Sequence, residues 1–257
     1  MRSWLPAQAS AHAPDIDFVL GLEHWGMLVL FGFFFAYFIY VLVRFRSGAH
    51  PTASHTGMAS RWSIYVVFAI ALAEGVLLIA FEMPEWNERI NKLPASEEAT
   101  VVRVVAEQFA WNVQYAGADG RFGRTDVGLV AADNPLGLDR RDPDAKDDVT
   151  AVNQLAVPVN RPVLIHLTSK DTVHSFTLYE MRVKQDAIPG ADSPVWFIPT
   201  VTTRDMRLRL GKPDFEYEIA CSQLCGLGHY RMRGFLNVMT DAEFRAYLAQ
   251  EAQSNPR

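Results

Sequence analysis

The chain has 257 residues, of which 49% are apolar and 21% are charged, and its mean hydropathy is close to zero at +0.02. This composition excludes a disordered chain, and the presence of only two cysteines excludes a small fold held by several disulfides. The net charge of −5 argues against a nucleic-acid partner, because phosphate binding needs an excess of Lys and Arg.

Two long apolar stretches near the N-terminus predict membrane-spanning helices. Residues 25–43 carry no charge, and residues 62–81 carry only Glu74. Both stretches are long enough to cross a hydrocarbon layer of roughly 30 Å, and both begin with tryptophan, which favours the headgroup layer. We therefore expect a transmembrane hairpin over residues 25–82, held in a lipid bilayer.

The positive charges predict the orientation of this hairpin. The segment between the two stretches contains Arg44, Arg46 and Arg61 and no acidic residue, so it should face the cytoplasm. Both chain ends should then lie outside a bacterial plasma membrane, which makes residues 1–24 an extracytoplasmic tail and residues 83–257 an extracytoplasmic domain. The first 13 residues of the tail end in a cleavage-like Ala-His-Ala at 11–13, but the apolar run before it is too short for a signal peptide, so we expect the tail to be retained.

The exported part alternates short β-prone runs with turn residues, which favours an all-β sandwich or barrel with antiparallel strands. The expected strands are 100–106, 109–115, 162–168, 173–179, 195–201, 206–211, 214–220 and 235–240. Only the final segment, which starts at Thr240 as an N-cap, is typical of a helix. Residues 117–149 contain eight aspartates and few apolar residues, so we expect an exposed insertion there.

Both cysteines fall in one segment, CSQLCGLGHYRM, as Cys221 and Cys225, followed by His229 and Met232. In an oxidising compartment, a disulfide or a thiol-redox pair is one interpretation. Thiolate, imidazole and thioether are also the soft donors that suit copper. Two thiolates can bridge two copper ions if another imidazole arrives from elsewhere in the fold, and His174, at the start of an expected strand, is a candidate.

The segments CSQLCGLGHYRM and VHSFTLYEMRVKQDAIPG resemble the copper A regions of subunit II of haem-copper oxidases. The resemblance extends over the two spans and the β-domain, and it implies a cupredoxin-like sandwich that holds a dinuclear copper A centre. It implies two bridging cysteines, one histidine for each ion, a weak methionine ligand and one backbone carbonyl. The implied ligands are His174, Cys221, Gln223 through its carbonyl, Cys225, His229 and Met232.

Two departures from the family pattern affect the expected cofactors and the electron path. Gln223 stands where most members have a Glu whose carboxylate also binds magnesium, and an amide is a poorer ligand for so hard a cation, so we do not predict magnesium. Phe109 stands where the family's aromatic cluster has the Trp that accepts electrons. The alternatives are therefore electron input through Phe109 or Trp111, or a donor that docks differently. Trp111 is equally consistent with a core residue. The chain lacks a Cys-x-x-Cys-His motif and should carry no c-type haem.

Two carboxylates near or inside the expected spans, Glu23 and Glu74, are candidates for pairing with another subunit or for proton transfer, because an ionisable group in a span is costly.

The resemblance implies the electron-input subunit of a respiratory terminal oxidase. Its donor would be cytochrome c or a similar periplasmic protein, and its acceptor the haem of subunit I, with further oxidase subunits present. One alternative is the equivalent subunit of a copper A nitric oxide reductase, and another is a Cys-x-x-x-Cys copper chaperone or thiol-redox protein. A quinol-oxidase subunit without metal is disfavoured because all the side-chain ligands are present.

Overall fold

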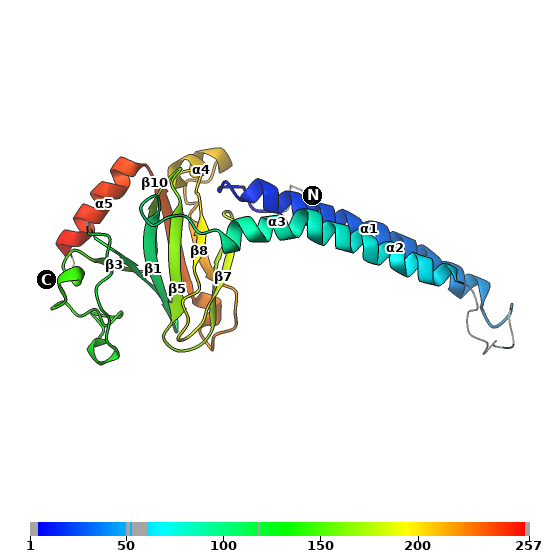
Figure 1. Cartoon of the computed structure of the whole chain (residues 1–257), viewed down its shortest axis with the longest axis horizontal. Coiled ribbons are helices and arrows are strands. Elements are labelled where there is room, and N and C mark those ends of the chain that lie inside the picture. Colours follow the sequence, from blue (N-terminus) through cyan, green and yellow to red (C-terminus); the bar gives the residue numbers. More distant parts are fainter. Residues whose placement is uncertain (1–4, 50–51, 53–60, 118, 255–257) are drawn as a thin grey trace. The chain divides into compact units, whose positions relative to one another are not determined.

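The computed structural model describes residues 5–49, 52, 61–117 and 119–254. Residues 1–4 of the expected tail, and 50–51 and 53–60 of the expected cytoplasmic segment, lie outside the described residues. The chain divides into two compact units (Figure 1). Residues 15–91 form the first unit, and residues 5–14 together with 92–254 form the second.

The first unit is the helical hairpin that the sequence predicts. Helix α1 spans Ala13–Arg44, and α2 spans Trp62–Leu77. The helical path then continues through a π-helical turn at Leu78–Glu82, α3 at Met83–Trp86, and a second π-helical turn at Asn87–Asn91. Both helical stretches are long and apolar enough to cross a membrane, and none of the side chains in their most apolar windows is buried inside the chain. This surface therefore needs lipid or another protein to cover it.

The two arms of the hairpin meet near the ends that connect to the second unit. Arg89 forms ion pairs with Asp15 of α1 at 3.0 Å and with Glu85 at 2.8 Å. The rings of Phe18 and Phe81 also approach, with centroids 6.2 Å apart. These contacts join the first turns of α1 to the last turns of the second helical stretch.

The second unit is a sandwich of two five-stranded sheets (Figure 1). The first sheet has the order β3-β2-β1-β5-β8, and the second has the order β4-β10-β9-β6-β7. The strands of the first sheet are β1 Thr100–Glu107, β2 Ala110–Tyr115, β3 Val149–Val152, β5 Val163–Ser169 and β8 Val195–Phe197. The strands of the second are β4 Gln154–Pro158, β6 His174–Leu178, β7 Val183–Ala187, β9 Tyr217–Cys221 and β10 Arg233–Met239.

The expectation of purely antiparallel pairing is wrong for two strand pairs. Strand β1 runs parallel to β5, and β10 runs parallel to β4, while the other pairs are antiparallel. Parallel neighbours need long connections, and the insertion between β2 and β3 is part of the connection from β1 to β5. Local alternation of apolar residues predicts a strand but not its neighbour, which explains the error.

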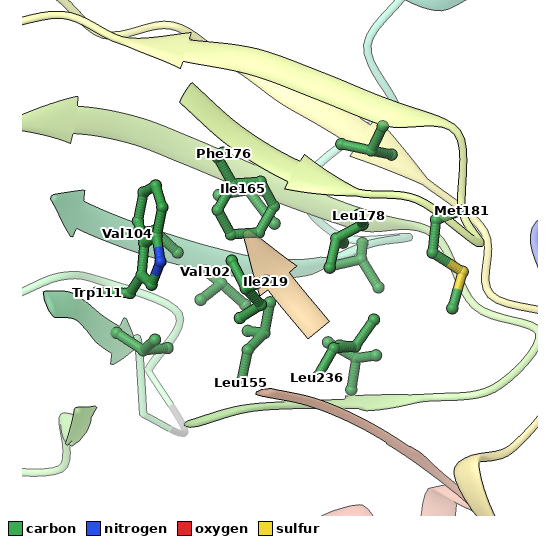
Figure 2. Packing of buried hydrophobic residues seen from close by; sticks show 14 of the residues in the cluster. Val102, Val104, Trp111, Leu155, Ile165, Phe176, Leu178, Met181, Ile219 and Leu236 are labelled. Atoms are coloured by element: carbon green, nitrogen blue, oxygen red, sulfur yellow. The ribbon is translucent and has the colours of Figure 1, made fainter. Parts of the chain in front are cut away.

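The core lies between the two sheets (Figure 2). In β1 every second residue is buried, which directs Val102 and Val104 inward from the first sheet. Trp111 and Ile165 of that sheet face Phe176 and Ile219 of the second across the interior, as Figure 2 shows. Burial of this apolar surface is the main force that holds the sandwich together.

The strand predicted at 206–211 is wrong, because residues 206–210 belong to helix α4, Thr203–Leu210, and Gly211 is its C-cap. The alternation in MRLRL is misleading, since Met206 is fully buried whereas Leu208 is 76% exposed. The helix has strong end signals: the Thr202 hydroxyl accepts a hydrogen bond from the Asp205 N–H, and Gly211 adopts a left-handed conformation with φ of 63°. The predicted C-terminal helix is confirmed as α5, Asp241–Ser254.

The 117–149 insertion is more ordered than an exposed acidic loop would be. It contains short 3-10 turns at Val127–Leu129 and Pro143–Ala145, and the side chains of Asp126 and Asp142 accept hydrogen bonds at their starts. The insertion contacts the first sheet, because Gln114 of β2 donates a hydrogen bond to Asp148 at 2.7 Å and the Arg103 guanidinium lies 4.4 Å from the centre of the Phe122 ring. Several of its aspartates therefore have structural roles as helix caps and ion-pair partners.

The N-terminal tail packs onto the β-sandwich. The Ala9 N–H donates to the carbonyl of Glu180, the Ala11 N–H donates to that of Ile198, and the Ser10 hydroxyl donates to the carbonyl of Met181 at 2.7 Å. Ala9 is fully buried. The tail thus forms part of the second unit, although it precedes α1 in sequence.

Candidate metal centre

The second sheet brings the two predicted metal-binding segments together. Strands β6 and β9 are antiparallel neighbours with Phe176 opposite Cys221, so His174 at the start of β6 lies beside the end of β9. Strands β9 and β10 also pair, and the segment from Cys221 to Met232 is the connection between them. The sheet register therefore places a histidine from one strand next to a loop that carries both cysteines.

The predicted ligand atoms converge at the end of the sandwich where the connection between β9 and β10 lies. The two cysteine Sγ atoms are 3.8 Å apart, and the Cys221 Sγ lies 3.9 Å from His174 Nδ1. The Cys225 Sγ lies 3.6 Å from His229 Nδ1 and 3.7 Å from Met232 Sδ. The structure therefore gathers donor atoms from five side chains that the sequence motifs predicted as ligands.

The backbone carbonyl predicted as the remaining ligand lies in the same cluster. The oxygen of Gln223 is 3.2 Å from the Cys221 Sγ. His174 is fully buried, and Cys225 and Met232 are each 3% exposed, whereas Cys221 and His229 are half-buried. The cluster is thus embedded in the domain, with one side close to solvent.

The donor set and its spacing fit copper. The nitrogen and sulfur atoms of His174, Cys221 and Cys225 all lie within 4.8 Å of one another, so one metal site could contact all three residues. Soft thiolate and thioether donors together with imidazole suit copper, whereas the hard cations Mg²⁺ and Ca²⁺ prefer oxygen. Both cysteines are free thiols, and their separation is well beyond the roughly 2 Å of an S–S bond.

The electrostatics of the thiols also favour a bound cation. Burial raises the pKa of the Cys225 thiol well above its usual value, and the adjacent Cys221 sulfur raises it further. Two neighbouring thiolates repel each other, so the doubly deprotonated form needs a positive charge between them. Metal binding supplies that charge and releases the protons.

Asp171 is a functional residue that the sequence analysis missed. Its Oδ1 accepts a hydrogen bond from His174 Nε2 at 2.9 Å, which leaves the Nδ1 lone pair directed at the sulfur atoms of Met232 and Cys221. Burial would raise the pKa of Asp171, but hydrogen bonds from His174 and from the Gln108 and Thr172 backbone N–H groups lower it below its ordinary value. Histidines that bind metals commonly donate their other N–H to a carboxylate. The only signal for this role in the sequence is that Asp171 lies three residues before His174.

The two aromatic residues proposed for electron input lie in different places. Trp111 is fully buried, and its ring lies 6.2 Å from that of His174 and 5.4 Å from that of Phe176. Phe109 is half-buried and lies against the cysteine loop, where a Cβ atom added to Gly228 would come within 2.4 Å of the phenyl ring. Only Phe109 can therefore contact a protein that approaches from solvent.

The two carboxylates considered for proton transfer do not belong to this cluster. Glu23 and Glu74 lie on the helical hairpin, where both line one cavity of about 810 Å³ together with Glu82. The structure thus places the two residues near a shared space within the first unit, and their role in proton transfer stays a prediction.

Comparison with known proteins agrees with the family resemblance of the two ligand-bearing segments. Residues 100–239 match the family model of the periplasmic domain of cytochrome C oxidase subunit II. The chain is 29% identical over 239 residues to the alternative cytochrome c oxidase subunit 2 of Bradyrhizobium diazoefficiens, covering 92% of this chain and 80% of that one. It is 26% identical to the cytochrome c oxidase subunit 2 of Cereibacter sphaeroides, covering 79% and 80%.

Among solved structures, the periplasmic domain of subunit II of the Bradyrhizobium japonicum cytochrome oxidase is similar, with 23% identity and a TM-score of 0.43. That comparison covers 64% of this chain and all of the other. With the family model matching over half of the residues, and with the cysteine loop, the added histidine and the two membrane-capable helices in place, the chain belongs to the cytochrome c oxidase subunit II family.

Proposed function

We propose that this chain is the electron-input subunit of a haem-copper oxidase and that it holds a dinuclear copper A centre. The observation that carries the proposal is the convergence of two thiols, two imidazoles, a thioether and a carbonyl at one end of the sandwich. The proposed ligands are His174, Cys221, Gln223 through its carbonyl, Cys225, His229 and Met232. Subunit II of such oxidases works with the haem-bearing subunit I, and the complex is an enzyme that reduces oxygen.

The chemistry that a copper pair held by these residues would supply is one-electron transfer, with the charge change spread over both ions. The protein's part is to hold the donors still. His174 begins a strand that is hydrogen-bonded on both sides, to β7 and to β9, and Cys221 ends β9. A rigid donor set changes little between oxidation states, so little energy is lost to rearrangement during each transfer.

We propose that the electron donor, cytochrome c or a similar periplasmic protein, binds over the cysteine loop beside Phe109. Three side chains of this loop point into solvent: Leu227 is 98% exposed, Tyr230 is 84% exposed and Leu224 is 76% exposed. Large exposed apolar side chains that cluster on one loop are typical of a binding surface. Phe109 supports a route inward from this surface, because it packs on the glycines of the same loop.

The membrane arrangement forms part of the same proposal. Residues 25–82 would anchor the protein, and residues 83–257 would form the extracytoplasmic copper domain, with tail residues 1–24 on the same side. The hydrogen bonds of Ala9, Ser10 and Ala11 to the β-sandwich support this arrangement, because they place the tail and the domain together. The arginines at 44, 46 and 61 support a cytoplasmic connection between the helices.

Stopped-flow reduction of the copper-loaded full chain in detergent by reduced cytochrome c tests electron input. We expect Phe109→Leu to slow reduction by about tenfold with unchanged copper content, because the aromatic contact between the donor surface and the cysteine loop is lost. Phe215→Leu is the matched control, since Phe215 packs against Tyr217 at a site away from the ligands. Equal rates for Phe109→Leu and the wild type would contradict input at Phe109, and failure of the wild type to accept electrons would contradict the proposed function.

A further inference from the structure

The turn between β1 and β2 contacts both halves of the candidate metal centre. The backbone N–H of Gln108 donates a hydrogen bond to Asp171 Oδ2 at 2.7 Å. The side-chain Nε2 of the same residue donates to the carbonyl oxygen of Cys225 at 2.5 Å. Gln108, in a turn of the first sheet, is thus hydrogen-bonded both to the turn before β6 and to the cysteine loop between β9 and β10.

Asp171 extends this connection to the buried histidine. Its Oδ1 accepts the His174 Nε2 hydrogen bond at 2.9 Å and also a bond from the Thr172 N–H at 2.6 Å. The carboxylate is therefore held by its own turn and by Gln108 while it orients the imidazole. A continuous path runs from His174 through Asp171 and Gln108 to Cys225.

We propose that Gln108 and Asp171 are positioning residues that set the distance between His174 and the Cys225 segment, and hence the geometry of the copper pair. We call this pair the Gln108–Asp171 clamp. The inference rests on the proposed copper site and deepens it, because it concerns how the protein prepares the ligands. The clamp consists of hydrogen bonds between protein atoms alone, so it can hold the ligands in position for binding.

The clamp also aligns the proposed electron-input residue with the metal ligands. Phe109 follows Gln108 directly, and its ring lies over Gly226 and Gly228. Gly226 has φ of +133°, a conformation that side chains rarely allow, and a Cβ atom there would meet the Gln108 Nε2 at 2.7 Å. The glycines therefore let the turn that carries both residues sit directly on the cysteine loop.

The clamp acts on only part of the ligand set, and this asymmetry can be measured. Its hydrogen bonds reach His174 and Cys225, while neither Gln108 nor Asp171 forms a hydrogen bond with His229 among the described residues. Loosening the clamp should therefore disturb the ion bound by His174 more than the ion bound by His229. The shared electron would then be distributed unequally between the two coppers.

The test uses the full chain in detergent, loaded with copper, in the wild-type form and with Asp171→Asn, Gln108→Leu and both changes together. We expect Asp171→Asn to weaken copper binding by about 10–100-fold, measured by competition with a chelator of known affinity. The paramagnetic resonance spectrum should show unequal coupling to the two nuclei, and the reduction potential should rise because a negative charge near the centre is lost. Gln108→Leu should change affinity and spectrum in the same direction.

If the two residues form one clamp, the double variant should lose less than the sum of the single losses, because each change already breaks the same path. The control is Asp192→Asn, which removes an equal charge and a carboxylate–histidine pair of 2.8 Å on His166, outside the ligand set. Circular dichroism checks folding, and if Asp171→Asn does not fold, Gln108→Leu decides alone. If Asp171→Asn and Gln108→Leu match Asp192→Asn in copper affinity and in the paramagnetic resonance spectrum, the clamp is overturned. A wild-type chain that binds no copper overturns the proposed function itself.

Discussion

At the residue scale, Trp111 shows how the core supports the candidate metal centre. Its ring fills the space behind His174 and meets Phe176 edge-on, with an angle of 90° between the ring planes. A fully buried indole contributes through packing and has no surface to offer to a donor protein. Its role is therefore to keep the imidazole in place from the core side, opposite the Asp171 hydrogen bond.

Replacing Trp111 with alanine should reduce the free energy of unfolding by about 3–5 kcal/mol, because a large buried ring leaves a cavity. Denaturant titration of the metal-free full chain in detergent, followed by circular dichroism, measures this loss. The fraction that remains folded and copper-loaded should still accept electrons from cytochrome c, because the proposed input surface at Phe109 and the cysteine loop is intact. An unchanged unfolding midpoint together with slow reduction would instead assign Trp111 to the electron path.

The sequence was sufficient to propose the ligand residues, because two of its segments resemble the copper A regions of the family, whereas spacing alone left His174 as one candidate. It was not sufficient for Asp171 and Gln108. Their importance depends on which backbone carbonyl and which imidazole nitrogen lie within hydrogen-bond distance, and this depends on how three turns meet in space. Phe109 and Trp111 were likewise equivalent candidates in the sequence, and only burial separates them.

At the element scale, the acidic insertion contains a buried carboxylate, that of Asp139, which forms ion pairs with two arginines of the insertion. The side chain of Asp139 is 7% exposed, and it pairs with Arg124 at 2.7 Å and Arg141 at 3.2 Å. The hydrogen bond from Arg124, together with the backbone and side-chain bonds from Arg141, lowers the pKa of Asp139 to about 2. The insertion therefore has its own ion-pair anchor.

Asp139→Asn should destabilise the insertion at neutral pH, and the effect should depend on pH in a defined direction. Because the folded-state pKa lies below the unfolded value, the ion pairs stabilise fully above about pH 4 and lose their effect as the pH falls through about 2. The difference in unfolding free energy between wild type and variant should thus be constant from about pH 5 to 8 and shrink in acid. Asp133→Asn, at an exposed position, controls for the loss of charge. A difference that grows toward low pH would contradict this account.

The strands that the sequence analysis does not predict, β3, β4 and β7, lack a clear alternation of apolar and polar residues. Strand β4 is buried at four successive residues, β7 has three polar residues at its centre, and β3 directly follows the acidic insertion. In α4, period-two alternation suggested a strand, whereas the Thr202 cap and Gly211 mark a helix. Long runs such as β1 and the two membrane-capable helices were predicted correctly because their patterns extend over many residues.

At the scale of the whole molecule, the N-terminal tail belongs physically to the β-sandwich. The ring of His12 lies 4.5 Å from that of Trp196, and Ser10 is 3% exposed. A fragment that starts after the helical hairpin would lack these contacts and expose the groups that they cover. Measurements of the metal centre therefore belong on the full chain.

The cysteine loop and His174 are proposed to hold two copper ions that share one electron. The most direct measurement is copper analysis together with electron paramagnetic resonance on the full chain, purified in detergent and loaded with copper. We predict two copper ions per chain and a spectrum from one electron delocalised over two nuclei, which Cys225→Ser abolishes while the chain stays folded and membrane-inserted. A metal-free chain with a disulfide between Cys221 and Cys225, or a spectrum that Cys225→Ser leaves unchanged, would contradict the claim.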